Sequence, residues 1–353
     1  MKKFLSHFLI FILFFIIINI IAALLWEPIK SSVFSKVNKK NIYSKEILEA
    51  IGLEKDEQFQ FYNEMWTARK FKYVQFAEHL ESETKEQKYV NISRDYGRRV
   101  ENNKDCEIRI FFYGASQVFG YNLKDNQTIP SYFKKKIDSN FKDKNYCVYN
   151  FGSANYYTTQ ENILFLNHFL GQKILPNDYA IFLSGYAEMG NQKSRIHDQI
   201  KYIFDNLELK VWGELIFGSK IFFNSLPIVK LYNHLHNKFS RKDLNLDDQL
   251  DNLDEKKMIE IDRVFKSNLG IRNAICKEIS INCFTFLPPI PSDTVKIIEA
   301  KYKLFKGSNH LIDISNVLDE SKSLNYVDGA HFSPNASKLI SEKILNTIQK
   351  NFN

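Results

Sequence analysis

Hydrophobic residues first occur as one continuous run at the start of the chain. Residues 4–26 contain no formally charged side chain and are dominated by Phe, Leu and Ile. At a helical rise of about 1.5 Å per residue, such a run can cross a hydrocarbon core of about 30 Å. The apolar part of a cleavable signal peptide is shorter, usually about 7–15 residues. Ala22 and Ala23 form a candidate processing site, but Leu24, Leu25 and Trp26 follow it and are typical of a membrane boundary. We therefore expect residues 1–26 to form an uncleaved N-terminal membrane anchor.

The charges beside this run leave its orientation open between two readings. Lys2 and Lys3 precede the run and four lysines follow it before residue 41, so counting positive charges favours a cytoplasmic body. However, a two-lysine start is the usual signal-anchor arrangement, and long domains cross the membrane with little regard to charge. We expect a single-pass membrane protein whose body is extracytoplasmic, either periplasmic or on the cell surface.

Beyond residue 105, short apolar runs alternate with segments of helical pattern. The runs have strand length, are rich in aromatic or β-branched residues, and span residues 107–113, 146–151, 179–184 and 282–287. Runs that are apolar on both faces belong in a parallel sheet covered by helices. The pattern predicts an α/β domain over residues 106–353, with a doubly wound parallel sheet and helices on both faces.

Two regions depart from this alternation. Residues 27–105 form a charged, irregular lead-in, with helical patches at 45–53 and 71–80, and we interpret it as a spacer or a flap. Residues 207–257 contain aromatic patches followed by a long polar run, which indicates an insertion ending in a solvated loop. Insertions of this kind commonly determine substrate selectivity.

The C-terminal part of the chain has clear helix signals. Residues 258–280 have a helical pattern, and a final helix is predicted where Ser333 caps the start and Pro334 takes the first position. Its apolar residues recur every four positions, at Ala336, Ile340, Ile344 and Ile348.

Composition narrows the classes of function. The chain has 353 residues, of which 44% are hydrophobic and 25% charged, so it can bury a substantial core. Its net charge of +7 is modest and spread along the chain, which suggests affinity for anionic lipid or acidic glycan, and no nucleic-acid motif is present.

Four cysteines allow three pairings. Local disulfides between Cys106 and Cys147 and between Cys276 and Cys283 are geometrically conceivable, and four buried free thiols are an equal alternative.

Candidate chemistry begins with Gly114-Ala115-Ser116, directly after the first predicted strand of the α/β domain. The serine is therefore expected at the carboxyl edge of the sheet, where open α/β folds place their ligands. A Gly-x-Ser after a strand is more often an ordinary turn. Val118 stands where a Gly-x-Ser-x-Gly elbow has its second glycine, so the common α/β-hydrolase elbow is absent.

Asp328 and His331 form the second element. An aspartate three residues before a histidine can accept a hydrogen bond from the ring Nδ1–H and leave Nε2 to take a proton from a serine. The structural alternative is a capping turn with an incidental histidine. His234 and His236 lie two residues apart, and without a third ligand we expect no metal site.

Five ordered segments resemble the sequence blocks of the SGNH (GDSL-like) hydrolase superfamily, a similarity that covers roughly residues 89–350. They read FFYGASQVFGYNLKDNQTIPSYF, VYNFGSANYYTTQENILF, YAIFLSGYAEM, FTFLPPIP and YVDGAHFSPNASKLISEKI. The preceding segment YVNISRDYGRR is similar to that of membrane-anchored, cell-envelope members. The resemblance implies a flavodoxin-like three-layer fold and a serine hydrolase that needs no cofactor. It implies Ser116 as nucleophile, Asp328 and His331 as acid–base partners, and backbone N–H groups of Ser116 and of Gly152 or Asn155 as the oxyanion hole.

Two departures from the family pattern affect the expected activity. The third block usually reads Gly-x-Asn-Asp, whereas this chain has Gly185-Tyr186-Ala187-Glu188, and alanine has no donor for the oxyanion. Gly185 and Glu188 are expected to contact substrate. Asn155 stands where many members have glycine, so its N–H or its amide side chain can face the oxyanion. Loss of one donor typically costs about 10²–10³ in rate.

These features predict a carboxylester hydrolase or acyl-transferring enzyme that acts on an acylated envelope glycan or lipid beside the bilayer. The alternative is a catalytically weak or inactive member of the same fold that binds glycan or serves in assembly.

Overall fold

The computed structural model describes most of the chain, in the ranges 2–39, 42–102, 105–189, 219, 222–239, 255–291, 296–319 and 324–352. It divides into two compact units. The helical unit comprises Met1–Ile42 with Arg195–Gln249, and the sheet unit comprises Tyr43–Ser194 with Leu250–Asn353. Each unit is described by itself.

The sheet unit contains a seven-stranded sheet in the order β3-β4-β6-β5-β7-β8-β9. The four predicted strands are confirmed, as β5 (Ile108–Gly114), β6 (Tyr146–Gly152), β7 (Tyr179–Leu183) and β8 (Asn282–Leu287). The sheet also contains β3 (Ile92–Ser93), β4 (Gly97–Arg98) and β9 (Ile312–Asp313). All neighbouring strands are parallel except β3, which is antiparallel to β4.

The sheet is therefore mixed at one edge, whereas the sequence predicts a purely parallel one. Strands β3 and β4 each have two residues, which is too short for a periodic pattern to appear in the sequence. Gly97 makes this edge possible. Its φ of +70° favours glycine, and a Cβ atom there would lie 2.1 Å from the carbonyl oxygen of Asn150 on β6.

The order of the parallel strands locates the ligand-binding edge. Numbered one to five along the chain, β5 to β9 lie in the order 2-1-3-4-5, which is the flavodoxin-like doubly wound arrangement. From β5 the chain first adds β6 on one side, and it then adds β7, β8 and β9 on the other side. Folds of this kind bind ligands outside the carboxyl ends of the strands at this switch point, between β5 and β7.

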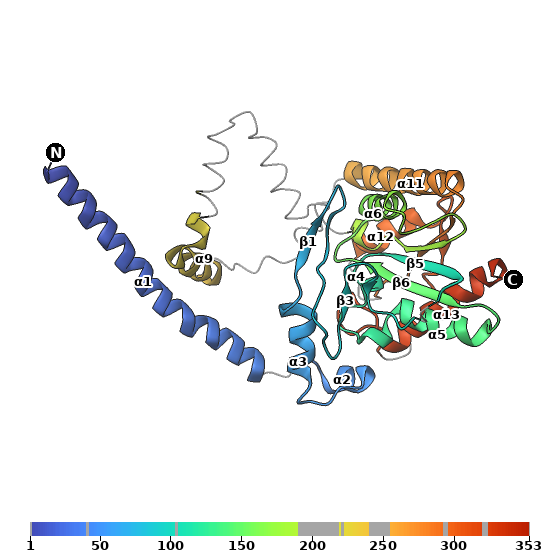
Figure 1. Ribbon diagram of the computed structural model, residues 1–353, viewed down its shortest axis with the longest axis horizontal. Helices are drawn as coiled ribbons and strands as arrows, with labels where there is room; N and C mark the ends of the chain where they lie inside the picture. Colours follow the sequence, from blue (N-terminus) through green and yellow to red (C-terminus); the bar gives the residue numbers. More distant parts are fainter. Residues whose placement is uncertain are drawn as a thin grey trace. The chain divides into compact units, whose positions relative to one another are not determined.

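Helices cover both faces of the sheet, which gives three layers (Figure 1). On one face, α5 (Ile129–Asn140) and α13 (Pro334–Ile348) pack against a set of strand side chains that includes Phe112. On the other, α6 (Thr158–Leu170) and α11 (Glu255–Glu278) pack against a set that includes Phe111 and Tyr113. Successive strand residues point to opposite faces, so the apolar runs fill both cores.

The C-terminal helices follow their predicted signals. Ser333 Oγ accepts a hydrogen bond of 3.2 Å from the Ala336 N–H, and Pro334 begins α13 as predicted. Helix α11 lies within three residues of the predicted helix at 258–280. A further helix, α12 (Lys296–Phe305), packs against α11 through Tyr302 and Phe305.

The lead-in is an integral part of the sheet unit from Tyr43 onward. It contains α2 (Lys45–Ile51), which lies in the predicted helical patch at 45–53, then α3 (Gln58–Tyr62) and the π-helical turn η1 (Asn63–Thr67).

The helical patch expected at 71–80 is wrong, because these residues form the hairpin of β1 (Phe71–Val74) and β2 (Glu78–Glu81). The turn has positive φ at Phe76 and Glu78, and Ala77 and Leu80 join the core beneath α6. Burial against a distant part of the chain therefore outweighs the local helical pattern.

All four cysteines form disulfides. Cys106 pairs with Cys147 at a Cα–Cα distance of 5.5 Å, and Cys276 pairs with Cys283 at 6.1 Å. Both distances lie in the usual range for disulfides. Of the alternatives that the sequence leaves open, the structure has the two local pairs.

The helical unit is built on the long helix α1 (Lys2–Lys39). Its segment Ser6–Trp26 has a mean hydropathy of 3.2 and is long and apolar enough to cross a membrane. Within the insertion predicted at 207–257, α9 (Pro227–Phe239) contacts α1. Most of the predicted polar run, at residues 241–254, lies outside the described residues.

Candidate active site

Ser116 lies at the switch point of the sheet. Strand β5 ends at Gly114, and the chain turns directly into the short helix α4 (Ser116–Phe119). Gly114 has φ +154°, and a Cβ atom there would lie 2.5 Å from Val118 Cγ2 and 2.8 Å from the Leu183 carbonyl oxygen. The glycine thus permits the sharp turn that places half-buried Ser116 at the first position of α4. A backbone N–H at this position has no partner within its own helix and is free to bind an anion.

Asp328 and His331 form a hydrogen-bonded pair in the loop before α13. His331 Nδ1 lies 2.7 Å from Asp328 Oδ2 and 2.9 Å from Oδ1. Asp328 Oδ1 also accepts the backbone N–H groups of Ala330 and His331, each at 2.8 Å. Burial raises the pKa of Asp328. The hydrogen bond from His331, its charge and the two backbone N–H groups lower this pKa by more, so it lies below its ordinary value. Because an ionised carboxylate only accepts hydrogen bonds, Nδ1 carries a proton, and Nε2 is then the acceptor of the neutral ring.

Two contacts join the loop after Ser116 to the loop of His331. Gln117 Nε2 donates a hydrogen bond of 3.3 Å to the Ala330 carbonyl oxygen. The Tyr121 ring stacks on the His331 ring with a centroid distance of 5.1 Å and an interplanar angle of 14°. Within the described residues, Ser116 Oγ makes no hydrogen bond to His331 Nε2. Such catalytic hydrogen bonds are often absent or long in unliganded sites and tighten when substrate binds.

Asn122 is a buried residue that sequence reasoning missed. Its Nδ2 donates a hydrogen bond of 2.7 Å to Asp328 Oδ2. Its Oδ1 accepts from Tyr43 OH at 2.9 Å and from Trp66 Nε1 at 2.7 Å. A chain of hydrogen bonds therefore runs from the lead-in through Asn122 and Asp328 to His331. Asn122 has φ +58°, a conformation that asparagine tolerates better than most residues. This angle is a property of the folded chain, so the sequence offered no signal for the role of Asn122.

Arg98 of β4 holds the loop that carries Tyr121 and Asn122. Its fully buried guanidinium donates to the carbonyl oxygens of Phe119, Gly120 and Leu123 and pairs with Asp125. A buried guanidinium needs this many acceptors to offset its loss of water. The segment YVNISRDYGRR contains this arginine.

The three N–H groups predicted for an oxyanion hole differ in their availability. In the described residues, the N–H groups of Ser116 and Asn155 have no acceptor. Asn155 is exposed and has φ +55°, a conformation that glycine and asparagine tolerate better than most residues.

The role predicted for Gly152 is wrong. Its N–H donates a hydrogen bond of 3.0 Å to Asn150 Oδ1. A Cβ atom on Gly152 would lie 2.2 Å from the Phe119 backbone nitrogen, so glycine here serves the close approach of β6 and α4.

The third block is mostly buried. Glu188 was predicted to contact substrate, but it is 1% exposed, and its carboxylate accepts the Thr158 N–H at the start of α6. Burial raises the pKa of Glu188. The prediction for Glu188 is therefore wrong, and its carboxylate instead satisfies a helix N-terminus. Gly185 is buried against Leu287 and Phe305, and its contact with substrate stays a prediction. Ala187 is half-buried.

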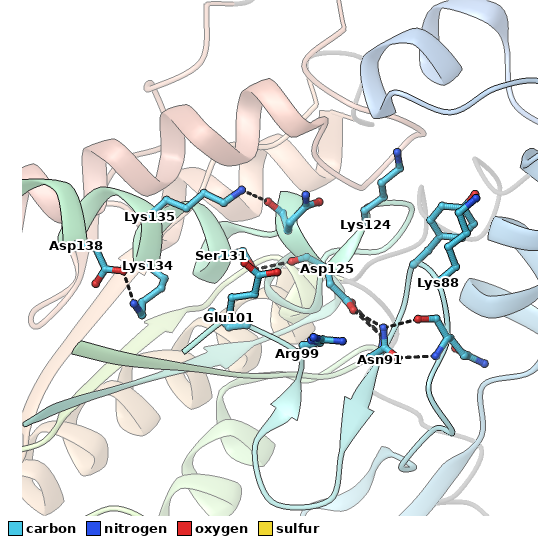
Figure 2. Close-up of a pocket in the computed structure, with 14 residues that line it drawn as sticks. Lys88, Asn91, Arg99, Glu101, Lys124, Asp125, Ser131, Lys134, Lys135 and Asp138 are labelled. Atoms are coloured by element: carbon cyan, nitrogen blue, oxygen red, sulfur yellow. Dashed lines mark hydrogen bonds and ion pairs between the residues drawn. The ribbon is translucent and has the colours of Figure 1, made fainter. Parts of the chain in front are cut away.

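A separate cavity of about 400 Å³ lies between the lead-in and α5 (Figure 2). Its lining contains several basic and acidic residues but none of Ser116, Asp328 and His331. Figure 2 shows that several of these residues bind one another: Lys134 pairs with Asp138, Lys135 donates to the carbonyl oxygen of Asn126, and Asp125 accepts from the Asn91 amide. This cavity is therefore held together by its own polar network. In the described ranges, no three His, Cys, Asp or Glu side chains gather as a metal site.

The fold and site together define a three-layer α/β protein with a serine and an Asp–His pair at the carboxyl edge of its sheet. No family model matches the chain, and no curated protein matches it. Similar solved structures include LAE5, an alpha/beta hydrolase from the metagenome of Lake Arreo (10% identity, 68% of this chain and 94% of that one, TM-score 0.40). Others are a lipase/acylhydrolase from Enterococcus faecalis (14%, 69% and 96%, TM-score 0.40) and a variant of the acetyl xylan esterase Axe2 from Geobacillus stearothermophilus (10%, 69% and 95%, TM-score 0.39). The fold assignment rests on the strand order and layers described above.

Proposed function

We propose that this chain is a membrane-anchored serine carboxylester hydrolase or acyl-transferring enzyme of SGNH type. The observation that carries the proposal is the position of Ser116 at the switch point, beside a loop in which Asp328 orients His331. The contacts of Gln117 with Ala330 and of Asn122 with Asp328 hold the two loops together.

The proposed chemistry is acyl transfer in two steps. His331 Nε2 takes the proton of Ser116 Oγ, which attacks the ester carbonyl carbon, and the N–H groups of Ser116 and Asn155 stabilise the oxyanion. The C–O bond to the alcohol then breaks, and His331 returns the proton to the leaving oxygen. A water molecule or a sugar hydroxyl next attacks the acyl carbon while His331 takes its proton. The acyl C–Oγ bond then breaks, His331 returns the proton to Ser116 Oγ, and acid or transferred ester is released. These steps need no cofactor.

The proposed substrate is an acylated envelope glycan or lipid, and the proposed location is the extracytoplasmic face of a membrane. Two disulfides support this location, because disulfides persist in oxidising compartments and are rare in the cytosol. The net charge of +7 suits anionic lipid or acidic glycan. Protease treatment of intact cells, after permeabilising any outer membrane, should remove the sheet unit. Protection of that unit until the inner membrane is broken would contradict this topology.

A fluorophosphonate probe tests the chemistry, since it labels only an activated serine. We expect labelling of the full-length protein that is lost in Ser116→Ala and strongly slowed in His331→Ala.

A second candidate is a glycan-binding or assembly protein with weak or no catalysis. Ala187 favours it, because this side chain cannot donate to an oxyanion. Absence of labelling, together with saturable binding of an acidic glycan, would favour this second candidate.

A further inference from the structure

One stripe of the apolar helix α1 is covered by protein. Ala22 is 2% exposed, and Phe15, Ile18, Asn19 and Trp26 are half-buried, whereas the other large side chains between residues 8 and 25 are exposed. Spacings of three and four residues place the covered positions on one helix face. Helix α9, the second long helix described in this unit, contacts α1 and lies beside it in Figure 1.

The covered stripe contains a polar residue in the middle of the apolar span. Asn19 Nδ2 donates to the Phe15 carbonyl oxygen of its own helix, and Asn19 Oδ1 is buried without a partner. Polar side chains in membrane spans usually face a neighbouring helix, because lipid offers them no hydrogen bond. Asn19 thus marks this stripe as an interface between helices.

The segment that contains α9 also has large apolar side chains on its outer side. We call residues 222–239 the α9 segment. Leu226, Ile228, Val229 and Leu231 are half-buried, while Phe222, Phe223, Tyr232 and Leu235 are exposed, with Tyr232 at 63%. A surface helix that packs by one face normally presents polar residues on the other. Exposed polar residues, among them Asn224, Asn233 and His236, stand between these side chains, so the outer side is amphipathic and suits the boundary between headgroups and acyl chains.

The neighbour of α9 indicates which environment that is. The covered positions of α1, from Phe15 to Trp26, lie inside the segment that is apolar enough to cross a bilayer. Because α9 contacts α1 and the covered positions of α1 lie in this segment, we infer that α9 is itself at membrane depth. With 13 residues, α9 is about 20 Å long, which is too short to cross a hydrocarbon core of about 30 Å. The exposed Lys230 can extend its ammonium group to the headgroups.

We propose that the α9 segment is a second membrane-bound element, which inserts partway into the bilayer against α1 and exposes the large apolar side chains of its outer side to lipid. The proposal rests on the retained anchor of the proposed function. Removal of α1 would uncover the inner side of α9, so the pairing also favours an uncleaved anchor. Along the chain, the helical unit resumes at Arg195, a few residues after the third sequence block.

Site-specific fluorescence in lipid nanodiscs tests the proposal on the full-length protein. Because all four native cysteines are in disulfides, single cysteines can be labelled without reductant. An environment-sensitive dye is placed at Tyr232→Cys and Leu235→Cys. Leu24→Cys on the exposed side of α1 is the membrane control, and Leu170→Cys at the exposed end of α6 is the aqueous control.

At positions 232 and 235 we expect blue-shifted emission, quenching by lipids brominated on their acyl chains, and several-fold weaker quenching by iodide than at 170. Quenching by iodide as strong as at 170 would overturn the proposal. Shielding from both quenchers would also overturn it, since protein, such as a second copy of the chain, would then cover this side. If position 24 itself is not quenched by lipid, the anchor fails and the proposed function loses its membrane attachment.

A photo-crosslinking residue at Ala22 gives an independent readout of the pairing. We expect the crosslinked peptides to come from the α9 segment. Crosslinks to lipid alone would show that this face of α1 is not paired with α9, which would contradict the proposal.

Discussion

The role of Asn122 gives the sharpest prediction about the candidate site. Asn122 Nδ2 is 2.7 Å from Asp328 Oδ2, and Asp328 in turn orients His331. Asn122→Ala removes this hydrogen bond and leaves the side-chain donors of Tyr43 and Trp66 without their acceptor. We expect Asp328 to lose its fixed orientation, so that His331 is held less well as the base.

The magnitude follows from the kind of hydrogen bond. A hydrogen bond to a charged group contributes about 1.5–3 kcal/mol. If that contribution is lost in the transition state, at about 1.4 kcal/mol per factor of ten, the rate falls about 10- to 150-fold. The loss should appear in kcat more than in KM, because Asn122 positions the base and contacts no substrate.

The assay is the second-order rate of fluorophosphonate labelling, together with hydrolysis of a short-chain ester. Asn126→Ala is the matched control, because Asn126 is exposed in the same loop and has no contact with Asp328. Asn122→Asp keeps an acceptor for Tyr43 and Trp66 but places a second carboxyl group beside Asp328, and we expect a further loss from like-charge repulsion. A labelling rate for folded Asn122→Ala that equals that of Asn126→Ala would refute the positioning role.

Three further predictions concern other parts of the sheet unit. Burial lowers the pKa of His168 to about 3, so below pH 6.5 the unfolded chain gains a proton that the folded chain does not. Stability should therefore fall by about 2 kcal/mol between pH 6.5 and 5, seen as a lower thermal midpoint, and the fall should be smaller in His168→Gln. Replacing Cys106 and Cys147 together by alanine opens a crosslink between residues 41 positions apart, and we expect the free energy of unfolding to drop by about 4 kcal/mol in denaturant titrations. Ala187→Asn should raise the esterase rate by up to about 10²-fold. An unchanged or lower rate would mean that another donor, such as Asn155, already serves the oxyanion.

The parts of the fold that the sequence predicts are those whose signals are local and strong. Strands β5 to β8 are visible because each is apolar on both faces, and α13 is visible because Ser333, Pro334 and the apolar repeat agree. Pairing of Cys106 with Cys147 could not be decided, since a disulfide depends on how the strands align. Edge strands of two residues give no period to detect.

Only the motifs that contain the candidate catalytic residues could be recognised in the sequence, and their roles stay predictions. Ser116, Asp328 and His331 stand in local motifs, and the structure brings their loops together. Asn122 and Arg98 were not found, because their roles depend on partners far away in the chain, such as Tyr43 at a separation of 79 residues. Gly152 and Glu188 were misassigned for the same reason, since their hydrogen-bond partners can be known only from the folded structure.

Covalent labelling of Ser116 tests the central claim most directly. The full-length protein, in detergent or nanodiscs, is treated with a fluorophosphonate probe, digested and analysed by mass spectrometry. We expect one modified peptide, carrying the probe on Ser116, with no modification in Ser116→Ala and much slower modification in His331→Ala. Folded wild-type protein that stays unmodified, or that is modified at a different serine, would contradict the assignment of Ser116 as the nucleophile.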